Sequence, residues 1–213
     1  LGNGAVTMYV NPTVTITNAA ATLDFGGAVS ESGGARNLTK AGLGTLKLSG
    51  DNDYTGTTTI NAGNLIVNGN HTSAGAYTVS AYGGFGGNGI ISSAVTVSAN
   101  GELRPGDGVG SLTLGAGLTL DGNSITRFNM DGGICDNVIV TGTLALNGTL
   151  DFSGNLRTGL YTIFTCTSGT ITNNIHTFSV PNSRYSANIT ISSNVASANI
   201  IAYPSYGTTI RFR

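Results

Sequence analysis

The stretch that decides the fold is Leu38–Gly69, which reads LTKAGLGTLKLSGDNDYTGTTTINAGNLIVNG. Apolar residues alternate in it with Thr, Lys and Asn, and each short run stops at Gly or Asn, a pattern that predicts short β-strands. Leu46 and Leu48 recur nineteen residues later as Leu65 and Val67. This spacing suits one coil of a parallel β-helix, because like positions of successive coils stack about 4.8 Å apart.

Similar short runs occupy most of the chain. Turn residues often interrupt them after four or five positions, whereas a sandwich has longer strands with turns every ~8–12 residues. No segment has the i, i+3, i+4, i+7 apolar spacing of an amphipathic helix. We therefore predict an all-β solenoid over residues 1–155, with coils of roughly 20 residues. Five side chains of the deciding stretch should face its core: Leu46, Leu48, Ile60, Leu65 and Val67.

The rhythm changes after about Asn155. The runs become longer and more aromatic, as in Leu160–Ser168 and Tyr185–Ser192, and looser loops separate them. A solenoid needs an atypical end unit because a bare last coil exposes unpaired strand edges. We therefore predict that residues 156–213 form a β-rich C-terminal cap or assembly region.

Leu38–Gly69 resembles the autotransporter-associated β-strand repeat, whose pattern is roughly L-x-K-x-G-x-G-T-L-x-L-x-G-x-N-x-Y-x-G-x-T-x-I-x-x-G-x-L. The matching positions are Lys40, Gly42, Gly44, Leu46, Leu48, Gly50, Asn52, Tyr54, Gly56, Thr58, Ile60, Gly63 and Leu65. The resemblance implies a right-handed parallel β-helix in an exported passenger domain, displayed on or released from a bacterial surface. It implies no single activity, because such passengers serve as adhesins, stalks and carriers of grafted domains.

Composition narrows the function classes. The chain has 213 residues, 33 of them Gly, only 9% charged residues and a net charge of −1. Its basic residues do not cluster, so we expect no nucleic-acid partner. No apolar run reaches the ~20 residues of a membrane-spanning helix, so we expect no transmembrane segment. The first residues resemble no signal peptide and include no initiator Met, so we expect a mature or excised segment.

Glycine-rich motifs offer two ligand-binding interpretations. Gly83–Ile90, GGFGGNGI, fits one copy of the calcium-binding nonapeptide if Asn88 replaces Asp. A calcium roll needs consecutive copies, and none follows, so structural glycine turns are favoured. The same stretch contains the spacing of a dinucleotide fingerprint but lacks the helix that would bind phosphate. We expect no cofactor and no metal here.

Catalytic interpretations find little support. Asp51 and Asp53 flank one turn, and Asp131 and Asp136 flank Cys135. Paired carboxylates can act as acid and base in polysaccharide-cleaving β-helices, yet solvated or turn-capping aspartates are favoured, with calcium at the turns as the main alternative.

No nucleophile completes a catalytic triad. His71 and His176 stand alone and are interpreted as loop histidines. Gly106–Ser111 resembles a serine-protease loop with the wrong residue order, because Gly108 stands where the nucleophile should be. We predict that the chain is not an enzyme.

Two features concern covalent and non-covalent pairing. Cys135 and Cys166 could meet on neighbouring coils of an exported protein, so a disulfide and two separate buried thiols both stay open. Near the C-terminus, Thr209, Ile210, Arg211, Phe212 and Arg213 form a candidate assembly strand with Ile210 and Phe212 on one face. We expect this strand either to mediate head-to-tail self-assembly or to belong to a longer passenger.

The sequence therefore predicts an extracellular bacterial structural protein, a β-helical rod or fibre subunit for adhesion or surface architecture. Its partners would be itself or the rest of a passenger, and surface glycans are a further candidate. The alternative is a carbohydrate-binding or polysaccharide-cleaving β-helix. Sugar binding commonly uses exposed aromatic platforms, and the chain has no Trp and 8 Tyr, which favours the structural reading.

Overall fold

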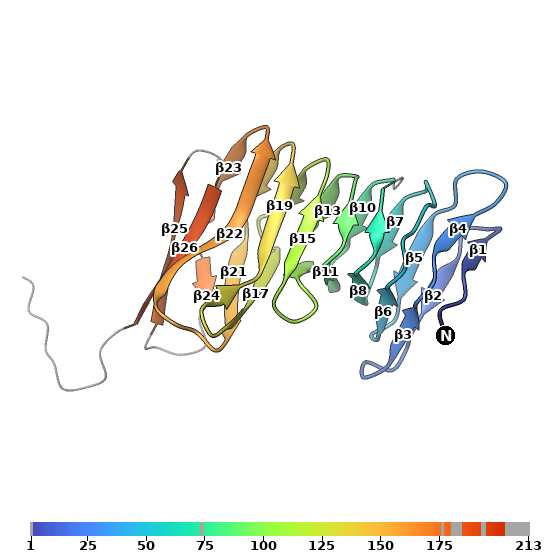
Figure 1. Ribbon diagram of the computed structural model, residues 1–213, viewed down its shortest axis with the longest axis horizontal. Helices are drawn as coiled ribbons and strands as arrows, with labels where there is room; N and C mark the ends of the chain where they lie inside the picture. Colours follow the sequence, from blue (N-terminus) through green and yellow to red (C-terminus); the bar gives the residue numbers. More distant parts are fainter. Residues whose placement is uncertain (1, 73–74, 176, 180–184, 193–194, 203–213) are drawn as a thin grey trace, which may run out of the picture.

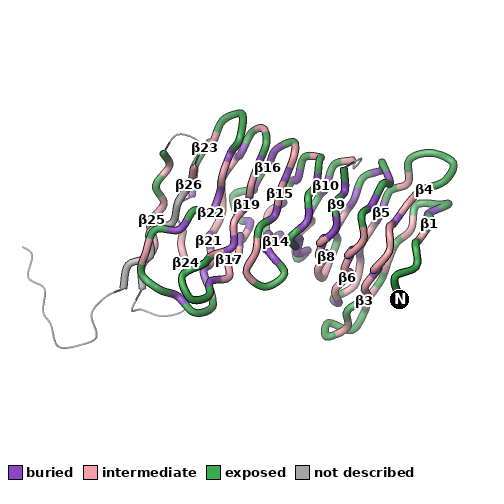
Figure 2. Tube along the Cα trace, viewed as in Figure 1, coloured by how far each residue is buried: buried purple, intermediate pink, exposed green. Residues whose placement is uncertain are grey.

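The computed structural model describes residues 2–72, 75–175, 177–179, 185–192 and 195–202. Over these ranges the chain is all-β, without a helix, and its strands stack as a parallel solenoid (Figure 1). The predicted fold class is confirmed. Three sheets run along the solenoid and enclose one apolar core. Figure 2 shows that buried residues recur along the whole stack of strands.

Each sheet forms one face of the solenoid. The first face contains β2 (Thr13–Thr15), β5 (Leu38–Ala41), β7 (Thr58–Ile60), β10 (Tyr77–Val79), β13 (Val95–Val97), β16 (Leu118–Leu120), β20 (Leu144–Leu146) and β23 (Ile171–Asn173). The second face contains β3 (Thr22–Phe25), β6 (Thr45–Leu48), β8 (Gly63–Val67), β11 (Gly83–Gly87), β14 (Glu102–Pro105), β17 (Ile125–Asp131), β21 (Thr149–Gly154) and β24 (Thr177–Ser179), with β18 (Ile134–Cys135) paired to β17. The third face contains β9 (Asn70–His71), β12 (Ile90–Ile91), β15 (Ser111–Leu114), β19 (Asn137–Thr141), β22 (Gly159–Ser168), β26 (Val195–Ala202) and β25 (Tyr185–Ser192). A separate pair, β1 (Val6–Met8) and β4 (Val29–Glu31), lies at the N-terminal end.

The strand register confirms the coil inferred from the deciding stretch. β6 pairs in parallel with β8, so that Leu46 lies opposite Leu65 and Leu48 opposite Val67. All five side chains predicted to face the core are fully buried. Alternation explains this result, because every second side chain of a strand points to the same side of its sheet.

Repeat residues close the gap between β4 and β9. The backbone N–H of Asn52 donates to Asn70 O at 2.7 Å, and that of Asp53 donates to Val29 O at 3.1 Å. The Asn52 side chain is buried, and its Oδ1 accepts from Val29 N at 3.0 Å while Nδ2 donates to Gly50 O at 2.9 Å. The side chain and the backbone N–H of Asn52 thus supply hydrogen bonds to neighbouring coils where no strand is present.

At the C-terminal end, the parallel coils extend further along the chain than residue 155, the predicted boundary of the solenoid. β22, β23 and β24 still pair in parallel with β19, β20 and β21, so the coils continue beyond residue 155. The strand direction changes only at β26, which runs antiparallel to β22, and β25 pairs antiparallel with β26. The assignment of residues 156–213 to a β-rich C-terminal cap or assembly region stays a prediction. The candidate assembly strand, Thr209–Arg213, and His176 lie outside the described residues.

Candidate functional site

The glycine-rich run that sequence analysis interpreted as turns forms a strand, β11, in the middle of the second face. Alternation buries Phe85 and turns Gly84 and Gly86 outward, between β8 and β14. A Cβ on Gly86 would lie 1.7 Å from Arg104 O, so the close approach of the β14 backbone requires glycine at this position. Because β11 carries no outward side chain there, the face is hollowed.

A loop crosses the outside of this face and forms one wall of the hollow. It spans Gly106–Gly110, directly after β14. Asp107 Oδ2 accepts from Lys47 Nζ at 2.5 Å and from Asn68 Nδ2 at 2.9 Å. Asn129 Nδ2 donates to Gly108 O at 3.3 Å. Gly106 N also donates to Gly87 O at 3.0 Å, so the two motifs that the sequence presented separately, Gly83–Ile90 and Gly106–Ser111, meet in space.

Asp136 fixes the far end of the loop. Its side chain is fully buried, and Oδ1 accepts from Gly110 N at 2.8 Å while Oδ2 accepts from Asn129 N at 2.7 Å. Burial raises the pKa of Asp136 to about 6, although both backbone N–H groups favour the carboxylate. The solvated alternative is wrong for this residue, whereas capping of backbone amides is confirmed. Its expected companion, Asp131, is exposed.

These parts enclose a groove of about 160 Å³. Its lining comes from β8, β11, the end of β14, the crossing loop and β17: Asn64, Leu65, Ile66, Gly84, Phe85, Gly86, Arg104, Gly106, Asp107, Gly108 and Asn129. We call it the glycine groove. Its floor is backbone and aliphatic carbon, and its rim carries amide, guanidinium and carboxylate groups.

Ion pairs follow the same face beyond the groove. Arg104 Nε donates to Glu102 Oε2 at 2.8 Å, and Arg127 Nε donates to the same oxygen at 3.1 Å. Arg127 also pairs with Asp151. The pKa of Glu102 lies below its usual range because the hydrogen bonds and charges of the two arginines outweigh desolvation by burial. Charges on this face are therefore largely matched with one another.

Asp107 is already held by Lys47 and Asn68, which keep its pKa below its usual range. Among the residues that the structure describes, no three His, Cys, Asp or Glu side chains come together as metal ligands. Asp51 caps a turn by accepting from Asn70 N at 2.8 Å, and Asp53 is exposed.

His71 is not the loop histidine that was expected. It lies on β9 and is fully buried. Nε2 is 2.7 Å from Tyr54 O and Nδ1 is 2.5 Å from Tyr77 Oη. A carbonyl can only accept, so Nε2 carries the proton and Nδ1 accepts from the tyrosine. Burial lowers the pKa of His71, which is consistent with this neutral form.

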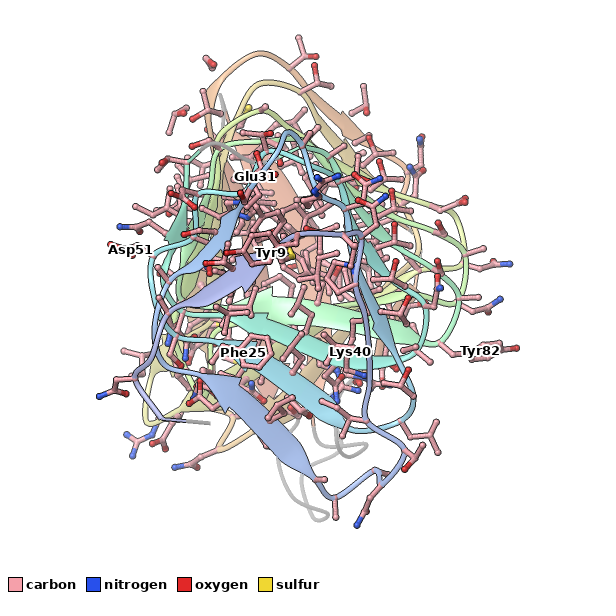
Figure 3. The ribbon with its side chains drawn as sticks, turned by 90° about the vertical axis from the view of Figure 1, so that its right-hand side faces the viewer. Tyr9, Phe25, Glu31, Lys40, Asp51 and Tyr82 are labelled. Atoms are coloured by element: carbon pink, nitrogen blue, oxygen red, sulfur yellow. The ribbon has the colours of Figure 1, made fainter. Side chains whose placement is uncertain are left out.

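Lys40 is a second interior polar residue that sequence analysis did not single out for a role. It is fully buried on β5, and Figure 3 shows it inside the solenoid. Its Nζ donates to three carbonyl oxygens, Ala41 O at 2.8 Å, Gly42 O at 2.7 Å and Ala62 O at 3.1 Å. Burial lowers the pKa of this lysine. The alternation of the strand could have indicated its burial, because Lys40 is two residues after the apolar Leu38 and therefore points to the same, inward side of β5.

Both cysteines are free thiols in the structure. Cys135 is half-buried on β18, and burial raises its pKa to about 12. Cys166 is buried on β22, with Sγ 2.9 Å from Ser168 O. The two thiols are thus separate in the structure, and only Cys166 is fully buried. The disulfide stays a prediction for mass spectrometry of the unreduced, alkylated protein.

Comparison with known proteins identifies the deciding stretch. Residues 38–67 match the family model described as the passenger-associated-transport-repeat. These residues are a passenger-associated transport repeat. The predicted family of the repeat is confirmed, and two of its pattern residues, Lys40 and Asn52, make the buried hydrogen bonds described above.

A curated relative extends the match over most of the chain. The adhesin BmaC autotransporter of Brucella suis biovar 1 (strain 1330) is 33% identical over 200 residues, which cover 85% of this chain and 6% of the relative. The chain thus spans a small part of the protein it matches. The repeat and this relative confirm the expected extracellular, cell-surface location. Within the described residues, no helix has the length and apolar character needed to span a membrane.

Proposed function

We propose that this chain is a non-enzymatic, rod-forming module of an adhesin passenger, and that its N-terminal end stacks against a further parallel coil. One observation carries the proposal. At that end the core is open, in a cavity of about 340 Å³. It is lined almost wholly by apolar side chains: Val6, Thr7, Met8, Tyr9, Val10, Pro12, Val14, Phe25, Val29 and Leu38.

Backbone pairing at this end supports the same proposal. β1, β2 and β3 are each the last strand of their sheets among the described residues. Open strand edges beside an apolar cavity favour pairing with another strand. A coil that continues the sheets would cover the edges and the cavity together. Tyr9 and Val10, which are 70% and 68% exposed, would be covered at the rim.

The occupant we favour is another coil of the same passenger polypeptide, supported by the greater length of the adhesin relative. A second copy bound head-to-tail would use the same surface and would produce a fibre, because such contacts do not close on themselves. The rod would then hold adhesive segments away from the cell.

Sedimentation velocity over a range of concentrations tests whether the end is an interface. We expect the isolated chain to self-associate and the double variant Tyr9→Lys, Val10→Lys to stay monomeric. Tyr82→Lys is the matched control, because Tyr82 is 80% exposed and points away from the side of the solenoid (Figure 3). A wild-type chain that remains monomeric at the highest concentration, or a control that also dissociates, contradicts the proposal.

The non-enzymatic part has its own test. The chain is incubated with a panel of bacterial and host polysaccharides, and new reducing ends are measured. We expect none above the level of a heat-unfolded sample. Time-dependent release from any polymer overturns this part and favours the polysaccharide-cleaving alternative.

A further inference from the structure

We propose that the glycine groove binds one neutral sugar residue of a surface glycan. The inference rests on the proposed role as an adhesin module and names a ligand class for it. A pyranose ring has an apolar C–H face and a ring of hydroxyl groups at its edge. A site for it therefore needs a flat apolar floor with hydrogen-bonding groups around it.

The floor meets the first requirement without an aromatic ring. Gly84 and Gly86 place no side chain on the outer surface of β11, where both are buried among their neighbours, and the partly exposed Ile66 of β8 adds an aliphatic side chain beside them. Sequence analysis disfavoured sugar binding because Trp is absent. A glycine strand next to a partly exposed isoleucine supplies a different apolar floor, which a search for aromatic residues does not find.

The rim meets the second requirement. Asn64, Arg104, Asp107 and Asn129 line the groove and offer both donors and acceptors. Part of this capacity is unused within the described part of the chain. Asp107 Oδ1 and Arg104 Nη1 have no hydrogen bond there, and the amide of Asn64 has only a contact of 3.5 Å from Nδ2 to Thr45 Oγ1. Sugar hydroxyls both donate and accept, so they suit such a mixed rim.

The wall of the groove is held in place before a ligand arrives. The crossing loop is tied by Asp107 to Lys47 and Asn68, by Gly108 O to Asn129, and by Gly110 N to the buried Asp136. Ties at three points of a five-residue loop reduce the ordering cost on binding. The contact between Asp107 and Lys47 on β6 is not needed to connect β14 to β15, so it serves to hold the loop over the groove.

Size and charge select the ligand within this class. A volume of about 160 Å³ is below the ~300–1,000 Å³ of pockets for larger ligands, so one ring fits and a peptide does not. Lys47 is matched by Asp107, and Arg104 and Arg127 are matched by Glu102 and Asp151. A neutral sugar leaves these pairs intact. One such site binds weakly, and many passengers on one cell would bind through avidity.

The test is saturation-transfer NMR on the folded chain with methyl glycosides of glucose, galactose, mannose and N-acetylglucosamine, followed by titration. We expect transfer to at least one of them. Asn64→Ala should weaken its Kd about tenfold, the loss expected from one or two hydrogen bonds. Asn70→Ala is the matched control on the third face, where Asn70 is exposed, and should leave Kd unchanged.

Gly84→Ala is the sharper variant. Its Cβ would lie 2.4 Å from Asn64 Oδ1 and 3.5 Å from the next atom, so the mobile end of one side chain can move aside. The methyl group fills the floor, and we expect sugar binding to disappear while the circular dichroism spectrum and thermal midpoint are kept. A Gly84→Ala variant that is folded and still binds overturns the proposal.

Further outcomes separate this proposal from the rod proposal. No transfer to any of the four sugars, or transfer only to acidic sugars such as methyl glucuronoside, overturns the neutral-sugar site. Sedimentation of Gly84→Ala reports on the N-terminal end independently, because the groove lies on the side of the solenoid. Loss of sugar binding with association unchanged is the result we expect.

Discussion

The repeat coils near the N-terminus and the wider coils near the C-terminus solve the same packing problem differently. In the first region, equivalent positions are 19 residues apart, as for Thr45 and Asn64, and buried polar side chains satisfy the backbone at the corners. In the second, the spacing reaches 28 residues, as for Leu150 and Phe178, and aromatic rings fill the interior. Strand alternation builds the faces in both, whereas the corners depend on individual side chains.

The aromatic interior should give the largest effect. Phe128 is fully buried, with ring centroids 5.5 Å from Phe152 in a stacked pair and 5.4 Å from Phe164 in an edge contact. Phe128→Ala should lower the free energy of unfolding by about 3–5 kcal/mol, measured by urea denaturation. Phe128→Leu is the control and should cost less. A loss under about 1 kcal/mol for the alanine variant would mean that the wide coils are not held by this cluster.

The polar interior of the repeat should come next. Lys40→Met keeps the aliphatic chain but removes the ammonium donor from Gly42 O and Ala62 O, while Ala41 O keeps the backbone N–H of Ile16 at 3.0 Å. The loss should cost about 2 kcal/mol or more. Lys47→Met on β6 is the matched control, because Lys47 is partly exposed and its ion pair with Asp107 should be worth under about 1 kcal/mol. Equal losses in urea denaturation would show that the buried ammonium has no special part in closing the coil.

The wider region should also respond to pH through Asp136. The folded state raises the pKa of this carboxyl from 3.8 to about 6, so folding favours the protonated form. Its contribution to stability is fully present below pH 3.8 and is lost as pH rises through about 6. The stability of the wild type minus that of Asp136→Asn should therefore increase as pH falls from 7 to 4. A flat difference in denaturation curves across this range would contradict the shift.

The smallest effect should come from His71, with the opposite sign. Burial lowers its pKa from 6.5, so folding disfavours the imidazolium. The contribution to stability is present above pH 6.5 and is lost as pH falls through the folded pKa. The wild type should lose stability relative to His71→Gln below pH 6.5, in denaturation curves recorded from pH 7.5 to 5. The same pH dependence of stability in the wild type and in His71→Gln would contradict a lowered pKa of His71 in the folded state.

Much of the solenoid was predictable because the alternation of inward and outward side chains is a local property of the sequence. Alternation and the 19-residue spacing predicted that Leu46 lies over Leu65. The same alternation would have placed Lys40 and His71 inside. Lys40 was read only as a motif position and His71 as a loop residue, since a polar residue at an inward position is usually assigned to a turn. The later coils lengthen without a repeat to mark them, so the change of rhythm after Asn155 did not indicate that parallel coils continue through β22, β23 and β24.

The glycine groove was less predictable because it depends on contacts across several coils. Both motifs that form it were noted in the sequence, Gly83–Ile90 and Gly106–Ser111. Nothing in either one indicates that Asp107 reaches Lys47, three strands away in the sheet, or that Asp136 anchors Gly110. Long-range side-chain ties have no periodic signature, so the structure was needed to bring the motifs together.

The parallel pairing of successive coils has a mechanical consequence. The backbone hydrogen bonds between coils run along the length of the rod, so a pull on one end loads the outermost coil first, and the next coil bears force only after that one has detached. Each coil shortens the rod by about 4.8 Å when it leaves, yet its roughly 20 residues release ~60–70 Å of extended chain. If the rod tethers a cell, as proposed above, its length would therefore increase in steps under shear, while the coils that remain stacked keep their sheets intact.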